Sequence, residues 1–92
     1  MNSHTTAKFR RQLAALPREI RRQAQEAYQR FLHDPWHPGL RFKRVHSLKP
    51  VYAVRINRDY RALGILQDND IVWFWIGSHA DYDKILQQLK HH

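Results

Sequence analysis

Two arginines in the second half of the chain have a setting suited to binding a phosphate group. Arg55 alternates with Val54 and Ile56 in a β-branched segment, so its side chain points away from theirs. Arg61 lies just past the turn at residues 57–59, so an antiparallel hairpin would make the two arginines neighbours. Two like charges there are unfavourable unless an anion binds both, which favours a phosphate-binding surface. The alternative is that each arginine pairs with a carboxylate or a backbone carbonyl.

A histidine at a strand-to-helix junction could supply proton transfer. His79 directly follows the Gly-Ser pair that ends the last apolar run, and histidine titrates near neutral pH. Its plain alternative is an ordinary residue at a helix N-terminus. Asp81 and Asp83 suit the positive end of the helix dipole without any catalytic role. Helical periodicity favours Tyr82 as a core residue.

Further basic residues surround a phenylalanine earlier in the chain. In a strand, alternation would place Arg41 and Lys43 on one face, and Arg44 with Phe42 on the other. This pattern predicts a basic strand edge. Phe42 is expected in the core, with stacking on a nucleobase as the alternative. Arg58, in the turn between the two arginines of the hairpin, adds a candidate phosphate contact.

The charge distribution points to an anionic partner. The formal net charge is +8, from 16 Lys and Arg against 8 Asp and Glu. Residues 8–61 hold 14 of the basic residues and 4 of the acidic ones. Such asymmetry indicates nucleic acid most often, then a membrane surface or an acidic protein. A solvated basic helix face without a partner is the plain alternative.

Composition excludes several other classes. Without Cys, the chain has no disulfide framework, thiolate zinc site or cysteine nucleophile. His33 and His37 straddle Pro35, so they form no helical metal pair, and no other spacing predicts a metal site. The chain has three glycines and no Gly-rich phosphate loop, which argues against a nucleotide cofactor. The longest apolar run, Ile71–Gly77, is too short to span a bilayer, and no signal-like segment is present. We therefore expect a cytoplasmic protein with no cofactor and no membrane contact.

One domain of residues 1–92 must position these side chains. Helical periodicity predicts a helix from Thr5 or Thr6 to Leu16 and a second from Pro17 to about Leu32. Four strands are predicted over residues 41–46, 51–57, 60–67 and 71–76, before a last helix that starts at Ser78 or His79. His91 and His92 resemble the start of a purification tag and are set aside. The order implies an α+β fold: a helical hairpin, a four-stranded antiparallel β-meander and a C-terminal helix, with the helices on one face.

Two segments resemble the RelE/ParE toxin superfamily of bacterial toxin–antitoxin systems. The first runs from Val51 to Leu63 and places Tyr60-Arg61 after a turn; the second, from Trp73 to Asp83, contains the junction Gly77-Ser78-His79. The resemblance covers about Thr6 to Leu89. The family's usual N-terminal strand is expected to be missing or very short, because the helical pattern begins by Phe9.

This resemblance implies a function and roles for particular residues. RelE-like members are small basic ribonucleases without a metal, and most cleave mRNA in the ribosomal A site. The ribose 2′-hydroxyl attacks the adjacent phosphate, so Arg61 and Arg55 would hold the phosphate and His79 would be acid or base. RNA or phosphate contact is further implied for Arg41, Lys43, Arg44, Arg58 and Tyr82. The implied partners are mRNA, the ribosome, and a cognate antitoxin laid over the basic face.

Two other functions fit the same scaffold. A ParE-like toxin poisons DNA gyrase, a protein target that requires no phosphate chemistry. A catalytically inactive RNA-binding protein of RelE fold would bind nucleic acid, with affinity that falls steeply with salt, and release no cleavage products. The combination of Arg55, Arg61 and His79 favours the nuclease.

Overall fold

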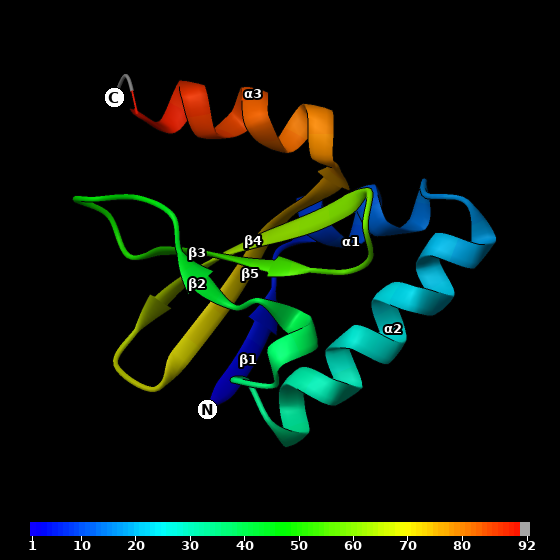
Figure 1. The fold of residues 1–92 in the computed structure, drawn as a ribbon, viewed down its shortest axis with the longest axis horizontal. Helices are drawn as coiled ribbons and strands as arrows, with labels where there is room; N and C mark the ends of the chain where they lie inside the picture. The colour runs from blue at the N-terminus through cyan, green and yellow to red at the C-terminus, as the bar shows by residue number, and fades with distance from the viewer. Residues whose placement is uncertain (91–92) are drawn as a thin grey trace.

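A computed structural model describes residues 1–90, so His91 and His92 lie outside the described residues. Residues 1–90 form five strands, three α-helices and one short 3₁₀ helix, arranged as Figure 1 shows. In chain order they are β1 (Asn2–Thr5), α1 (Ala7–Ala14), α2 (Arg18–His33), η1 (Pro38–Leu40), β2 (Lys43–Arg44), β3 (Val51–Arg55), β4 (Tyr60–Gln67), β5 (Asp70–Ser78) and α3 (His79–Lys90). The α+β fold and the order of its predicted elements are confirmed.

The sheet has one strand more than the predicted meander. Its order is β1-β5-β4-β3-β2; the last four strands are antiparallel neighbours, and β1 pairs with β5 in parallel. Backbone hydrogen bonds from Asn2 N to Asn69 O (2.7 Å) and from Thr6 N to Trp73 O (3.0 Å) bracket the added strand. Strand β1 covers the edge of β5, whose backbone groups would otherwise lack partners.

The helices lie on both faces of the sheet, which corrects the expectation of a single covered face. Helices α1 and α2 cover one face, and α3 covers part of the other (Figure 1). In the first core, Phe31 of α2 makes edge contacts with Phe42 (5.1 Å between ring centroids) and Trp73 (5.2 Å). Phe42 is therefore a core residue, as expected. The second core is smaller and consists of Val51, Ala53, Leu63, Trp75 and Tyr82.

Strand β2 is shorter than the six residues predicted. The 3₁₀ helix η1 ends at Leu40, which is only 1% exposed, and Arg41 follows in the left-handed conformation (φ 47°, ψ 40°). Extended pairing therefore begins only at Lys43. The expected placement of Arg41 and Lys43 on one strand face is thus wrong, because Arg41 lies outside the strand.

Helix α1 begins close to its predicted start at Thr5 or Thr6, and Thr6 is its N-cap. Thr6 Oγ1 accepts a hydrogen bond from Phe9 N at 3.0 Å, which satisfies one of the free N–H groups of the first turn. Among residues 1–90, no helix combines the length and the apolar character needed to cross a bilayer.

Candidate functional site

The β3–β4 hairpin brings the two arginines together as the alternation predicted. Arg55 and Arg61 are direct cross-strand partners, so their side chains leave the sheet on the same face. Lys43 is paired with Ala53, two residues from Arg55 along β3, and therefore shares that face. This face is the one on which α3 packs.

Arg61 is held by backbone carbonyls and still keeps binding capacity. Its Nη1 donates to Asn57 O (2.6 Å), Tyr60 O (3.0 Å) and Arg58 O (3.3 Å). Within residues 1–90, Nε and Nη2 of Arg61 donate to no protein acceptor, and no carboxylate forms an ion pair with this residue. One nitrogen thus fixes the side chain, while two others remain free to bind an anion.

The charges around Arg61 make this point of the surface strongly positive. Burial lowers the pKa of the Arg61 guanidinium, and the charges of Arg55 and Arg41 lower it further. Arginine nevertheless stays protonated at neutral pH. A bound anion would relieve the repulsion among these cations, so the arrangement favours a phosphate ligand.

The turn between β3 and β4 also fixes the start of α3. Asn57 Oδ1 accepts from Asp59 N at 2.8 Å, which closes the turn. Asp59 O accepts from His79 N at 2.7 Å. The turn that holds the Arg61 guanidinium therefore also fixes the position of the His79 backbone. Gln23 of α2 hydrogen-bonds the Asn57 amide and ties the turn to the helical hairpin.

His79 is accessible and oriented by its own helix. Its side chain is 47% exposed, and its Nδ1 lies 3.4 Å from Asp83 Oδ2, one turn further along α3. Its ring also meets the edge of Tyr82 at a centroid distance of 5.5 Å. With Nδ1 turned toward Asp83, Nε2 is the nitrogen free to exchange a proton with a ligand.

Tyr82 is a core residue that borders the site. It is 7% exposed and packs in the second core. Burial raises the pKa of its phenol, and the Asp83 carboxylate acts in the same direction, against the Arg61 charge. Tyr82 is therefore a neutral phenol at physiological pH. Its packing matches the periodicity-based expectation, whereas the RNA contact implied by the resemblance remains a proposal.

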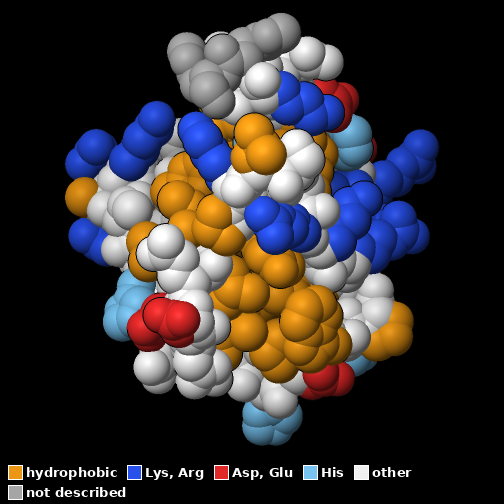
Figure 2. All heavy atoms as spheres, turned by 90° about the vertical axis from the view of Figure 1, so that its left-hand side faces the viewer, with side chains coloured by type: hydrophobic (Ala, Val, Ile, Leu, Met, Phe, Trp, Pro, Cys, Tyr) orange, Lys and Arg blue, Asp and Glu red, His pale blue; other side chains and the backbone are white. Residues whose placement is uncertain are grey.

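The other basic candidates divide between the two faces. Arg44 is paired with Tyr52, on the face opposite to Lys43, and its Nε donates to His46 O at 2.9 Å. It therefore does not join the Arg55–Arg61 cluster. Arg41 lies close enough to Arg61 to alter the pKa of that residue. Figure 2, which views the molecule from the side opposite α2, shows Lys and Arg side chains flanking an exposed apolar area.

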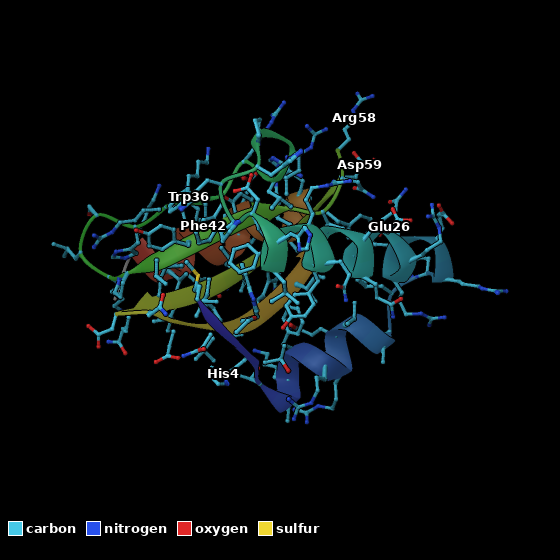
Figure 3. All side chains as sticks on the ribbon, turned by 90° about the horizontal axis from the view of Figure 1, so that it is seen from below. His4, Glu26, Trp36, Phe42, Arg58 and Asp59 are labelled. Carbon is cyan, nitrogen blue, oxygen red and sulfur yellow. The ribbon has the colours of Figure 1, made fainter. Side chains whose placement is uncertain are left out.

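Arg58 lies at the outer end of the β3–β4 turn. Its side chain is exposed and extends outward beside Asp59 (Figure 3). Its backbone carbonyl is one of the three that bind Arg61. The side chain is thus available for a long-range phosphate contact, although it lies at the rim of the site.

Two contributors to the site were not singled out from the sequence. Asn57 builds the turn that supports Arg61, and Asp83 orients His79 rather than only complementing a helix dipole. The four-residue spacing of His79 and Asp83 was the available signal, because such residues are neighbours on a helix. In the part of the chain described, no group of three or more His, Cys, Asp or Glu side chains could hold a metal ion.

Comparison with known families assigns the chain to a protein family. The model of the ParE-like toxin domain matches residues 18–84, which include the basic hairpin and His79. The chain belongs to the ParE-like toxin domain family. This confirms the predicted membership of the RelE/ParE superfamily. No match was found among curated proteins.

Solved structures of toxins share the fold of this ParE-like toxin domain. The RelB–RelE antitoxin–toxin complex of Methanococcus jannaschii matches with a TM-score of 0.72 at 13% identity, over 89% of this chain and 96% of that chain. YafQ of E. coli matches with a TM-score of 0.70 at 10% identity, over 88% of this chain and 96% of that chain. The RelBE2 complex of Mycobacterium tuberculosis matches with a TM-score of 0.66 at 22% identity, over 85% of this chain and 96% of that chain.

Proposed function

We propose that this protein is the toxin of a type II toxin–antitoxin system and cleaves mRNA, on the ribosome, without a metal ion. The observation that carries the proposal is the Arg55–Arg61 pair beside an accessible, oriented His79. This combination supplies two cations for a phosphate and one group that can exchange a proton. Membership of the ParE-like toxin domain family supports the toxin assignment.

The proposed reaction is an internal phosphoryl transfer. The ribose 2′-oxygen attacks the adjacent phosphorus, the bond to the 5′-oxygen of the next nucleotide breaks, and a 2′,3′-cyclic phosphate forms. The free Nε and Nη2 of Arg61, together with Arg55, would stabilise the charge that develops on the pentavalent phosphate. Preorganisation by the three carbonyls keeps Arg61 in place without reorganisation during the reaction.

His79 would act as the general base or the general acid. As base, Nε2 takes the proton of the 2′-hydroxyl; as acid, it gives a proton to the departing 5′-oxygen. Asp83 beside Nδ1 orients the ring. Tyr82, which is buried, supports the imidazole through their edge contact.

The exposed basic residues around the cluster would bind the RNA backbone. Arg41, Lys43 and Arg58 are exposed, and each could neutralise a phosphate of the bound strand. Arg44 emerges on the other face of the sheet and would contribute less. An antitoxin would bind this toxin as RelB is found with RelE in the M. jannaschii complex. An mRNA substrate on the ribosome implies action in the cytoplasm.

The proposal is tested by translating a defined message in a purified system and mapping mRNA ends by primer extension. Wild-type protein should produce cuts at ribosome-occupied codons, and His79→Gln and Arg61→Lys should reduce cleavage on the order of 10²-fold or more. Arg44→Ala is the matched control, because it removes an arginine from the opposite face; it should cleave nearly as the wild type does.

Other outcomes would overturn the nuclease assignment. Intact mRNA together with loss of gyrase supercoiling activity would establish the gyrase-directed alternative. Salt-sensitive RNA binding without cleavage products would establish an inactive RNA-binding protein. Full cleavage by His79→Gln would leave the nuclease in place but remove His79 from its mechanism.

A further inference from the structure

Gln23 is a polar side chain at the edge of the buried stripe of α2. It directly precedes Ala24 and lies one turn before Ala27, and both alanines are buried in the first core. Gln23 itself is half-buried, and its Oε1 accepts a hydrogen bond from Nδ2 of the half-buried Asn57. An amide that packs beside apolar neighbours gives up contact with water, so it needs a specific hydrogen-bond partner.

This contact joins two layers of the fold at the candidate site. Helix α2 passes the β3–β4 turn on the side of the sheet opposite α3 (Figure 1). Within residues 1–90, no other hydrogen bond links α1 or α2 to residues 57–59. Gln23 is therefore the point at which the helical hairpin holds this turn.

The turn that Gln23 holds carries acceptors that the site depends on. Asn57 O accepts from Arg61 Nη1 at 2.6 Å. Asp59 O accepts from His79 N at 2.7 Å. A displacement of the turn would therefore shift the Arg61 guanidinium and the start of α3 together. Gln23 hydrogen-bonds only the turn, so its effect on the two site residues has to pass through these carbonyls.

We propose that Gln23 is a positioning residue for the phosphate-binding and proton-transfer groups of the site. This inference rests on the proposed function. From the opposite face of the sheet Gln23 fixes the turn, and the turn sets the placement of Arg61 relative to the His79 backbone. Catalysis depends steeply on such placement, because a misplacement of about 1 Å can lower a rate on the order of 100-fold.

Single-turnover cleavage on the ribosome measures placement separately from binding. Ribosomes stalled on a defined message are mixed with excess toxin, and the cleaved fraction over time gives the maximal rate and the half-saturating toxin concentration. Gln23→Met keeps the length and helical preference of the side chain but has no amide oxygen. It should lower the maximal rate on the order of 10- to 100-fold and leave the half-saturating concentration unchanged, because the exposed basic residues are intact. Gln25→Met is the matched control, because Gln25 is an exposed glutamine of the same helix; both parameters should equal those of the wild type.

A pair of carboxylate substitutions identifies the hydrogen bond itself. Gln23→Glu keeps an oxygen that accepts from the Asn57 amide, so it should retain most of the wild-type rate. Asn57→Asp keeps the oxygen that accepts from Asp59 N but leaves no donor for a carboxylate introduced from α2. Gln23→Glu made in the Asn57→Asp protein should therefore lower the rate on the order of 10-fold, because two carboxylates then face each other. Equal effects of Gln23→Glu in both proteins would overturn the bond as the cause.

Hydrogen exchange tests the position of the turn without requiring nuclease activity. The His79 backbone amide is protected by Asp59 O, so its exchange rate reports how often the turn separates from α3. In Gln23→Met this rate should rise by roughly 2- to 10-fold, the effect of one lost hydrogen bond on a local opening. General destabilisation would instead raise exchange equally at the buried Ala62 of β4.

An unchanged maximal rate in Gln23→Met would overturn the positioning role and leave the nuclease in place. A lower rate with equal changes in exchange at His79 and Ala62 would also overturn it, because the loss would then reflect general destabilisation. If the wild-type protein cleaves no message, the nuclease assignment fails, and faster exchange confined to His79 would still establish Gln23 as the residue that holds the turn.

Discussion

Replacing His46 tests what anchors the C-terminal end of α3. His46 is 7% exposed; its Nδ1 accepts hydrogen bonds from Leu48 N (3.0 Å) and Lys49 N (2.9 Å), and its Nε2 lies 3.0 Å from Leu89 O. Because Nδ1 accepts, the proton of the neutral ring is on Nε2 and is donated to Leu89 O. One side chain therefore joins the β2–β3 loop to the helix that carries His79.

The expected cost follows from these three hydrogen bonds. At about 1 kcal/mol each, His46→Ala should lower the free energy of unfolding by about 3 kcal/mol. For a domain of this size that corresponds to a decrease in melting temperature of about 10–25 °C. His46→Asn should lower the free energy of unfolding by only about 1 kcal/mol. An asparagine Oδ1 can still accept from Leu48 N and Lys49 N, but no atom of the asparagine reaches Leu89 O.

Urea denaturation followed by circular dichroism and tryptophan fluorescence measures both differences. His33→Ala is the control, because His33 is exposed; its stability should stay within about 0.5 kcal/mol of the wild type. If His46→Ala were as stable as this control, or if His46→Asn were as unstable as His46→Ala, the hydrogen-bonded role of the imidazole would be refuted.

Three further substitutions probe the packing of the site and its surroundings. A Cβ on Gly77 would lie 2.7 Å from Trp75 Cζ2, so Gly77→Ala should cost about 1–3 kcal/mol in urea denaturation; an unchanged midpoint would contradict the close contact. Burial raises the pKa of Tyr82 in the folded state. The stabilisation that its neutral phenol provides is therefore complete below the unfolded-state pKa near 10 and is lost as pH rises through the higher folded-state pKa. Stability measured from pH 8 to 11 should therefore fall less in Tyr82→Phe than in the wild type, and equal losses would refute that linkage. Thr6→Ala removes the cap that accepts from Phe9 N and should cost about 1 kcal/mol, whereas Thr6→Ser should restore most of it.

The parts of the fold that periodicity governs could be predicted from the sequence. Helix α2 follows an apolar pattern of period 3.6, and β5 follows an uninterrupted apolar run. The alternation around Arg55 predicted its position beside Arg61. The position of Phe42 in the core follows from the same physics. These predictions depend on which side chains avoid water, and that information lies within each segment.

The remaining features depend on partners distant in the sequence. Strand β1 is polar and forms because the edge of β5 offers backbone groups, so its residues carry no apolar signal. The side of the sheet taken by α3 is decided by Leu63 and Trp75, whose burial requires a cover on that face. The left-handed Arg41 follows from the end of η1. None of these constraints is readable from one segment alone.

The β3–β4 turn supports the candidate site through main-chain atoms. Three carbonyls bind the Arg61 guanidinium and a fourth binds His79 N, and every residue type carries such an oxygen. The site therefore depends on the length and backbone path of the turn rather than on the side chains of Arg58 and Asp59. Changing either residue should leave the framework of the site intact, whereas inserting one residue would shift all four acceptors. A comparison of residue identities alone would overlook this part of the site, and a comparison of loop lengths would find it.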